Sequence, residues 1–395
     1  YSIIPNSDQA VYYQNRLWVK SGKDTLKASD VLDFTAYDDI ANSFNIGTGN
    51  SDFLVTTYPF GDNSLVVFKN RSIIVLQNVQ GSLSDVTTTE VTRQVGAIGI
   101  NSVVSVGPDL AYVSDRNINL ITLTTTSNSV QHKILPLSQA ISKLFDRVNW
   151  DYGYKISLGY FDNKLYVALP LDNATVCNTV VVHNFLTNTW FGEWNFDSVL
   201  DIAIQGWVVA EYLGLQRIHA VTEDGRIFVT NEGPMDVSGS NIFEISSSMT
   251  SRAYAVNNDT RVNRRMWADL GTWRPSFSIT GYVDGASEST TLLSAQTYSR
   301  STSWIFNDST YSLTNSGDDY NREGRQDYAC LCSDSAQCQS GFYPEMMQEY
   351  RYPLLFRRAG RLVWIKIANT QGVISINGIG TEARYGDRSN RVQVI

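Results

Sequence analysis

Histidine and cysteine are scarce in this sequence, whose 395 residues include three of the first and four of the second. So few cysteines do not describe a disulfide scaffold for a chain of this length. No signal-peptide pattern is present, and no apolar run reaches the roughly 18 residues of a membrane-spanning helix. Runs of Ala, Glu, Lys and Leu, which favour helices, are nearly absent as well. These absences predict a protein with no membrane anchor and little helix.

Strand-forming residues are abundant instead. The sequence has 21 Tyr, 16 Phe and 9 Trp, and it is rich in Val, Ile, Thr, Ser and Asn, a composition typical of all-β proteins. Its length suits one large or two ordinary domains, each able to bury a sizeable core. The chain begins at Tyr1 rather than at Met, so we expect a processed, truncated or incomplete sequence.

The net charge of −8 is unevenly distributed. The first 240 residues carry 15 Lys and Arg against 24 Asp and Glu, whereas the remainder carries 16 against 15. An acidic surface repels phosphate, so the first part is not expected to grip nucleic acid, although it could line a passage to which DNA must not adhere. Ordinary solubility charge is the simpler interpretation.

A hairpin pattern recurs along residues 1–238. In LVVFKNRSIIVLQN (65–78), two apolar strands flank a polar turn, and similar turns fall near residues 15, 116, 163 and 224. A further hairpin, turning at 186–188, is expected to lengthen the last interval. A period near 45 residues with Asx turns predicts a β-propeller of five or six four-stranded blades. A β-sandwich with irregular hairpins is the alternative, and WD40 and kelch signatures are absent.

Residues 239–395 have longer runs of alternating apolar and polar residues than the first part of the chain. This pattern predicts a second, β-sandwich-like domain. Longer alternating strands are expected at 261–273, 276–285 and 361–385, the last turning at Asn369–Gly372. Between them lies a polar insertion, about 285–350, that is rich in Ser, Thr, Asp, Asn and Tyr. Long insertions of this kind are typically binding loops or disordered segments.

The search for catalytic and metal-binding residues gives no candidates. His183 and His219 lie inside predicted strands, where a structural imidazole is the ordinary outcome, and neither these nor His132 shows a partner at a useful spacing. Metal-binding His pairs, nucleophile elbows, P-loops and dinucleotide fingerprints are absent. Three cysteines form C-x-C-x5-C in the insertion, far from Cys177, a weak zinc signal that leaves a disulfide or free thiols open. They are Cys330, Cys332 and Cys338. We therefore predict a protein that is not an enzyme, with no cofactor.

Some propellers are glycosidases, but the carboxylates of this sequence do not form the pattern of a glycosidase site. The segment TEDGRIF (222–228) has the wrong spacing for a sialidase Asp box and occurs once. The pairs Asp38-Asp39 and Asp318-Asp319 are sequence neighbours in polar stretches, where solvated turn residues are expected, and a glycosidase needs two acids across a cleft.

Two further groups have a structural and a functional interpretation. The tryptophans in or beside strand patterns could stack on sugars, but core packing is the expected role; these are Trp190, Trp194, Trp207 and Trp364. An arginine-rich group suits bidentate contacts between subunits or, alternatively, a soluble strand edge. Its members are Arg261, Arg264, Arg265, Arg357, Arg358 and Arg361.

The chain resembles a family of viral assembly proteins over about residues 10–235. The resemblance rests on AVYYQNRLWV, NIGTGNSDFLVTTYPFGDNSLVVFKNRSIIVLQ, IGINSVVSVGPDLAYVSDRNINLI and FDRVNWDYGYKISLGYFDNKLYVALPLDN. These segments are similar to those of the tail nozzle proteins (tail tubular protein B, or stabilization proteins) of short-tailed bacteriophages. The segment LVWIKIANTQGVISINGIGTEA resembles more loosely the β domain that follows in that family.

This resemblance implies a structural virion protein, made in the host cytoplasm and carried in the phage tail. It implies a ring, commonly a hexamer, below the head-to-tail adaptor, in contact with other tail proteins such as fibres or spikes, through which double-stranded DNA leaves without sequence-specific binding. Family members often carry a segment upstream of the first matching motif. The competing hypothesis is a carbohydrate-binding or glycan-cleaving propeller, such as a receptor-binding lectin or a glycosidase.

Overall fold

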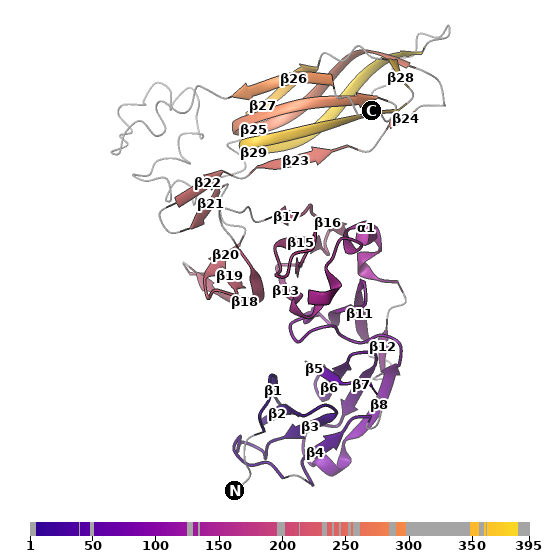
Figure 1. The fold of residues 1–395 in the computed structure, drawn as a ribbon, viewed down its shortest axis with the longest axis vertical. Coiled ribbons are helices and arrows are strands. Elements are labelled where there is room, and N and C mark those ends of the chain that lie inside the picture. Colours follow the sequence, from indigo (N-terminus) through magenta and orange to yellow (C-terminus); the bar gives the residue numbers. More distant parts are fainter. Residues whose placement is uncertain are drawn as a thin grey trace. The chain divides into compact units, whose positions relative to one another are not determined.

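The structure, a computed structural model, is all-β, with several antiparallel sheets and few helical turns (Figure 1). It describes residues 5–38, 40–47, 51–124, 129–132, 135–195, 202–212, 214–230, 235–238, 241–244, 246–251, 254–255, 261–283, 290–297, 348–354, 359–360 and 362–385. The chain divides into two compact units, Tyr1–Thr230 and Asn231–Ile395. The sequence prediction placed this boundary at residue 238.

Unit 1 contains five sheets, named here first to fifth in chain order. The first comprises β1 (Ala10–Tyr13), β2 (Arg16–Ser21), β3 (Thr25–Ala28) and β4 (Ser43–Asn45), and the second β5 (Leu54–Phe60), β6 (Ser64–Lys69), β7 (Ile73–Gln77) and β8 (Thr87–Thr92). The third comprises β9 (Val103–Val106), β10 (Asp109–Ser114), β11 (Asn117–Thr124) and β12 (Ser129–His132). The fourth contains β13 (Ser157–Phe161), β14 (Lys164–Leu169), β15 (Thr179–Asn184), β16 (Thr189–Trp190) and β17 (Trp194–Asn195), and the fifth β18 (Ile204–Tyr212), β19 (Leu215–Thr222) and β20 (Ile227–Val229).

Short helical turns lie within the second sheet and between the third and fourth sheets. The segments are η1 (Leu83–Asp85), η2 (Leu137–Ile141), α1 (Ser142–Phe145) and η3 (Trp150–Lys155). All of them lie in loops between strands, as the scarcity of helix-forming runs predicts.

The predicted turns are confirmed where Asn, Asp or Gly supplies a left-handed residue. Asp162 and Asn163, with φ of 48° and 57°, close the β13–β14 hairpin, and Asn15 (φ 58°) closes β1–β2. Two consecutive positive φ values match the right-handed twist of the flanking strands. Gly225, at φ 84°, lies in the β19–β20 turn.

The uneven spacing of the predicted turns has a simple origin. The turn near residue 15 joins the first two strands of its sheet, whereas the turn near residue 70 joins the middle two. The hairpin predicted at 186–188 is present as the β15–β16 connection. It belongs to the same sheet as the turn at 162–163, so the fourth sheet contains two of the predicted turns.

Strand β6 shows why the apolar runs are continuous rather than alternating. Leu65 and Val67 pack in a core shared with the first sheet, while Val66 and Phe68 pack in a core shared with the third. All four side chains are fully buried. A strand buried on both faces has no solvated side, so each successive residue is apolar.

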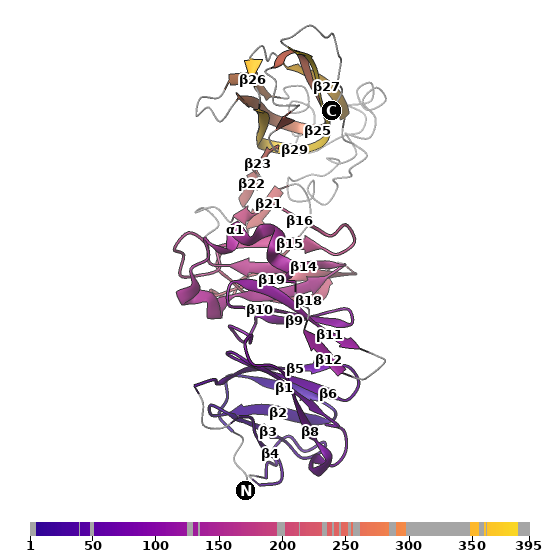
Figure 2. The ribbon, with the colours of Figure 1, turned by 90° about the vertical axis from the view of Figure 1, so that its right-hand side faces the viewer.

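The other junctions repeat this arrangement, and Figure 2 shows the first, second and third sheets following one another in the order of the chain. In β10, Tyr112 stacks 5.3 Å from Phe68 of the second sheet, while Ala111 and Val113 belong to the core shared with the fourth. Trp207 of the fifth sheet lies 5.3 Å from the ring of Tyr166 in β14, and its Nε1 donates to the Ser157 carbonyl oxygen at 3.4 Å. Each sheet therefore packs on the next.

A buried lysine joins the first two sheets. Lys69, at the end of β6, has 1 % of its surface exposed. Its Nζ donates to the carbonyl oxygens of Ile46 (3.0 Å) and Gly47 (3.3 Å), and it lies 3.4 Å from Asp24 Oδ1. A buried ammonium group is tolerated only when its donors are satisfied in this way.

Unit 2 is organised around two long strands, β25 (Arg261–Val283) and β29 (Leu362–Tyr385), which pair with each other along most of their length. Their seven-stranded sheet also includes β23 (Ser247–Thr250), β24 (Tyr254–Ala255), β26 (Thr290–Thr297), β27 (Gln348–Leu354) and β28 (Ala359–Gly360), and β21 (Met235–Ser238) pairs separately with β22 (Asn241–Glu244). Leu270, Phe277, Ile279 and Ile365 are among the residues of its core.

Three expectations for this unit are corrected. Residues 369–372 form no hairpin, because β29 continues through them and Asn369 pairs with Phe277 of β25. The strands expected at 261–273 and 276–285 are one strand with a register shift between Trp273 and Ser276. Strand β26 lies inside the predicted insertion 285–350, and the described strands of the expected sandwich belong, apart from β21 and β22, to one hydrogen-bonded sheet. Asn and Gly signal a turn only weakly when a long partner strand continues opposite them.

The Lys69 contacts yield a stability prediction. In Lys69→Met the side-chain stem is retained, but Asp24 and two carbonyl oxygens lose their cation, so we expect a loss of about 3 kcal/mol in the free energy of unfolding. Chemical denaturation of the full chain measures this change. Lys20→Met, which removes the more exposed pair with Asp8, is the control, and we expect it to cost less than about 1 kcal/mol. Equal stabilities for the two variants would contradict the assigned role of Lys69.

Candidate functional site

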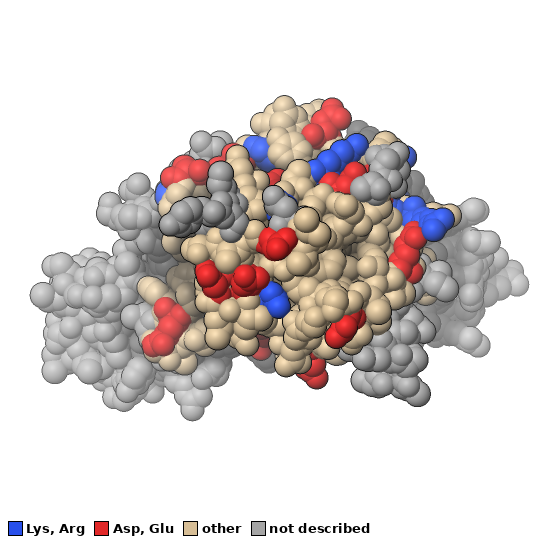
Figure 3. Space-filling model, turned by 90° about the horizontal axis from the view of Figure 1, so that it is seen from below, with Lys and Arg blue, Asp and Glu red and all other residues tan. Residues whose placement is uncertain are grey.

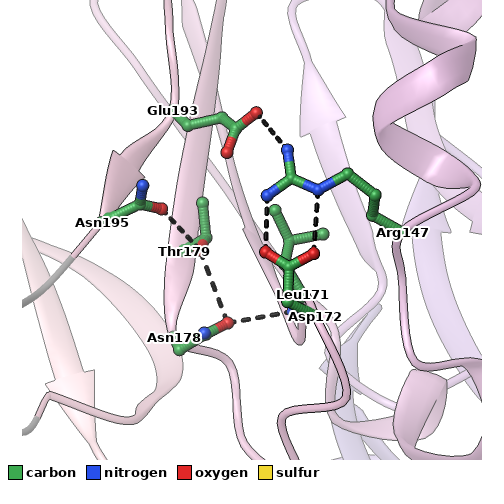
Figure 4. A network of polar contacts seen from close by, with 7 residues as sticks. All are labelled: Arg147, Leu171, Asp172, Asn178, Thr179, Glu193 and Asn195. Atoms are coloured by element: carbon green, nitrogen blue, oxygen red, sulfur yellow. Dashed lines mark hydrogen bonds and ion pairs between the residues drawn. The ribbon is translucent and has the colours of Figure 1, made fainter.

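A network of polar contacts lies at one end of the fourth sheet (Figure 4). Arg147 forms a bidentate salt bridge with Asp172, in which Nε lies 2.9 Å from Oδ1 and Nη2 lies 2.6 Å from Oδ2. Its Nη1 donates to Glu193 Oε1 at 2.7 Å. One guanidinium group thus links three separate loops.

Local backbone geometry brings these loops together. Arg147 follows α1, and its neighbour Val148 forms an isolated bridge with Leu171. Asp172 and Asn173 both have positive φ, 53° and 66°, and turn the chain between β14 and β15. The backbone N–H of Asp172 donates to the Arg147 carbonyl oxygen at 3.1 Å. The backbone hydrogen bond therefore holds the Asp172 carboxylate close to the Arg147 side chain.

A second set of hydrogen bonds supports the same loops. The Asn178 side-chain oxygen accepts from the backbone N–H of Leu171 at 2.9 Å, and the Thr179 hydroxyl donates to Asn195 Oδ1 at 2.9 Å (Figure 4). These contacts tie the start of β15 to β17 and to the loop after β14. The cluster is thus suited to holding loops in place.

The electrostatics of the carboxyl groups favour a structural role. The Arg147 hydrogen bonds lower the pKa of Asp172. The pKa is lowered for Asp33 chiefly by the Thr35 hydroxyl, for Asp38 by the N–H groups of Ala41 and Ile40, and for Asp224 chiefly by the Thr222 hydroxyl. A general acid for glycoside cleavage needs a pKa raised toward neutrality, so these four positions are poorly suited to that task.

His183 is the most deeply buried histidine among those whose side chains are described. It is 1 % exposed, and its ring lies 4.6 Å from Phe185 and 4.8 Å from Trp190. Burial lowers its pKa, partly offset by a hydrogen bond with Asn188. This aromatic environment fits the predicted structural imidazole.

The other histidines and the cysteines occupy different settings. His219, 7 % exposed, lies on β19 with Nδ1 3.2 Å from the Arg217 carbonyl oxygen, and the backbone of His132 belongs to β12. Cys177 is buried, and burial raises the pKa of its thiol to about 12. The three insertion cysteines, at 330, 332 and 338, lie outside the described residues.

Of the two carboxylate pairs considered from sequence, one member, Asp38, lies within the described residues. Asp38 is exposed and accepts N–H bonds from its own turn, while Asp39, Asp318 and Asp319 lie outside the described residues. The Asp224 carboxylate caps the β19–β20 turn, where Thr222 and Arg226 donate to it. Each described member is therefore a turn residue.

The tryptophans and arginines can be placed in part. Trp190 packs against the core that includes Phe145, Trp207 packs on the fourth sheet, and Trp364 stacks 5.6 Å from Tyr282. Trp194 is 6.1 Å from Tyr166. The backbones of Arg261, Arg264 and Arg265 lie in β25, whereas Arg357, Arg358 and Arg361 lie outside the described residues.

Sequence reasoning missed the residues that make the polar junctions. Arg147 was not singled out, nor was Lys155, which lies 2.8 Å from Glu223 and links η3 to the fifth sheet. The Asp172-Asn173 dipeptide was a usable signal, because consecutive Asx residues favour a tight turn. Nothing local identifies its partner, 25 residues away.

Within the described ranges, no group of three or more His, Cys, Asp or Glu side chains could hold a metal ion. Over those same ranges, none of the helices has the length and apolar character needed to cross a bilayer.

Acid should destabilise the protein through His183. Because its pKa is lower in the folded chain, the unfolded chain binds the proton more readily, and the stability contributed by the neutral ring is complete above about pH 6.5 and declines as the pH falls. We expect His183→Gln and His183→Phe to flatten the dependence of unfolding free energy on pH between 7 and 5. Denaturation at each pH tests this, and slopes equal to that of the parent would show that the proton is taken up elsewhere.

Loosening the Arg147 cluster should change loop mobility more than overall stability. Arg147→Lys keeps the charge but loses the fork that holds both carboxylates, so we expect faster hydrogen exchange over residues 171–174. The exposed position predicts little change in unfolding free energy. Arg226→Lys alters another exposed pair and should leave exchange at 171–174 unchanged. Equal exchange in parent and Arg147→Lys would refute the proposed clamp.

The similarity of this chain to Raptor, a protein of known structure, is distant. The chain matches no protein-family model and no curated protein sequence. Among solved structures it is similar to Raptor from Chaetomium thermophilum, at 11 % identity and a TM-score of 0.39. The match covers 66 % of this chain and 23 % of Raptor, so it spans less than a quarter of that protein. A similarity at this level identifies neither a family nor a function.

Proposed function

We propose that this chain is a structural virion protein that acts by assembly, as one subunit of an oligomeric ring in the tail nozzle of a bacteriophage. The observation that carries the proposal is the series of five antiparallel sheets in unit 1, each packed on the next. The segments of residues 10–235 that resemble the nozzle family are the strands and turns of these sheets.

In this proposal the five sheets are propeller blades, and unit 2 is the β domain that follows them. The antiparallel meander order supports blades, and so does the burial of both faces of the middle sheets. The four-stranded sheets match the expected blade. A propeller of five or six blades would offer its rims to neighbouring subunits, and heterologous contacts that close produce rings.

In this proposal the ring is a hexamer, as the family resemblance implies, and it lies beneath the head-to-tail adaptor and contacts fibres or spikes. Double-stranded DNA passes through it without sequence-specific binding. The acidic balance of the first 240 residues, 15 Lys and Arg against 24 Asp and Glu, supports a channel wall that repels phosphate. A channel wall found to be basic would remove this part of the proposal.

The competing proposal is a propeller that binds or cleaves glycans. Exposed aromatic side chains such as Tyr154 and Phe191, 57 % and 41 % exposed, are the kind of group that stacks on sugar rings. The lowered pKa of Asp172 and Asp224 counts against cleavage at those residues. A lectin remains a separate functional class, and it can be distinguished by saturation with a soluble sugar.

Native mass spectrometry and electron microscopy of the full chain test the leading proposal. We expect closed rings, binding to tail adaptor subunits, and no turnover of glycans by the parent or by Asp172→Asn. Monomers that neither self-associate nor bind an adaptor would contradict it. Glycan hydrolysis that is lost when one carboxylate becomes its amide would instead establish the competing proposal.

A further inference from the structure

The fifth sheet is attached to unit 1 differently from the other four. Three hydrophobic cores join the first sheet to the second, the second to the third and the third to the fourth, and among the described residues none of them contains a side chain of β18–β20. Strands β18 and β19 lie instead against β13 of the fourth sheet. The contact is made on the side of Trp207, where Ile218 and Ala220 of β19 are buried.

Trp207 is the largest side chain at this contact, and it is seated over a glycine. Gly159, in the middle of β13, is buried, and a Cβ atom at this position would lie 2.5 Å from Cγ and 2.6 Å from Cβ of Trp207. Gly159 pairs with Tyr166 of β14, whose ring lies 5.3 Å from the indole, and the indole Nε1 donates to the Ser157 carbonyl oxygen. A glycine inside a strand often marks a close approach of this kind.

Beyond Trp207, strand β18 is exposed on both sides. Trp207 and Val209 point to the same side because side chains alternate along a strand, yet Val209 is 45 % exposed. Val208 and Tyr212, on the opposite side, are 44 % and 42 % exposed. A segment with few buried apolar contacts belongs to the least stable part of a fold.

The polar contacts between the fourth and fifth sheets add little to this attachment. Lys155 Nζ lies 2.8 Å from Glu223 Oε1, but both side chains are partly exposed, and such pairs contribute little stability. The backbone N–H of Ile204 donates to the Cys177 carbonyl oxygen at 3.0 Å. The seat of Trp207 over Gly159 is therefore the specific contact that holds the fifth sheet.

The first sheet, at the other end of the series, is anchored by buried groups. Its Trp18 and Leu26 belong to the core shared with the second sheet, and Lys69 adds its buried hydrogen bonds. Figure 3 views the molecule from the side of β3 and β4 in Figure 1 and shows charged side chains scattered over a largely uncharged surface. Because burial holds the first sheet, we expect it to open less readily than the fifth.

We propose that the fifth sheet, β18–β20, is a releasable flap that separates from the fourth sheet as a unit while the first four sheets stay folded, and that Trp207 over Gly159 is its latch. Release uncovers the ring of Tyr166, which is otherwise 1 % exposed. The flap thus lets the chain present an aromatic surface without unfolding its other sheets. This inference goes beyond the proposed ring function and applies to a single chain as well as to a ring subunit.

Hydrogen exchange of the full chain, followed by mass spectrometry, tests the flap. In the parent we expect the paired amides of β18–β20 to exchange at least about tenfold faster than those of β6, β10 and β14, because local opening costs less free energy than global unfolding. Gly159→Ala forces the indole from its seat, so exchange of β18–β20 should rise by a further factor of about ten while β6 and β10 stay unchanged. Gly192→Ala is the matched control, because a Cβ atom there has no heavy atom within 4 Å, and we expect it to exchange like the parent.

Two further variants separate release of the flap from a general loss of stability. Trp207→Ala removes the indole without adding a clash, so it gives the same test if Gly159→Ala does not fold, and β18–β20 should again exchange faster than in the parent. In the double variant the added methyl group meets no indole, so its exchange should equal that of Trp207→Ala alone.

Two results would overturn the flap. One is equal exchange of β18–β20 and β14 in the parent, and the other is a rise in Trp207→Ala that is spread evenly over β6, β10 and β14. Neither result depends on native mass, so the flap and the ring function can fail separately.

Discussion

A strand that is apolar on both faces requires a packed neighbour on each side, and this requirement organises unit 1. Leu65, Val66, Val67 and Phe68 alternate between the core shared with the first sheet and the core shared with the third. Full burial of each such side chain contributes about 2 kcal/mol, so the second sheet is stable only between the other two. The same dependence passes along the series to the fourth sheet. The first and fifth sheets differ, because each packs on a neighbouring sheet of this series through one face only.

Polar side chains at the junctions determine how the sheets meet. The Lys69 ammonium group reaches three oxygens of the first sheet and its loops, and Arg16 donates to the Ser29 and Gly81 carbonyl oxygens at 2.7 and 3.0 Å. Apolar faces alone tolerate sliding, whereas a buried cation is satisfied in one arrangement only. These contacts, with Lys155–Glu223, give the junctions a defined register while hydrophobic burial supplies most of the stability.

Among the described residues of unit 1, the Arg147 cluster links loops and the His183 ring packs among aromatic side chains. Arg147 neutralises Asp172 and Glu193 at once, and the imidazole of His183 is enclosed by Phe185 and Trp190. Both arrangements stabilise one protonation state of the group. A general acid or base needs instead a pKa near the operating pH. Rigid loops of this kind are compatible with the assembly role proposed above.

The sequence by itself determined the strands and turns of unit 1. Asn15, Asp162 and Gly225 mark turns because their local backbone preferences need no distant partner, and the run from Leu65 to Phe68 indicates burial on both sides. Tertiary structure alone decided the pairings. Arg147 meets carboxylates 25 and 46 residues away, Lys69 meets Asp24, and Asn369 continues a strand where its local signal favoured a turn. The reason is physical: a turn depends on the dihedral preferences of adjacent residues, whereas an ion pair or a long strand partner depends on the path of the whole intervening chain.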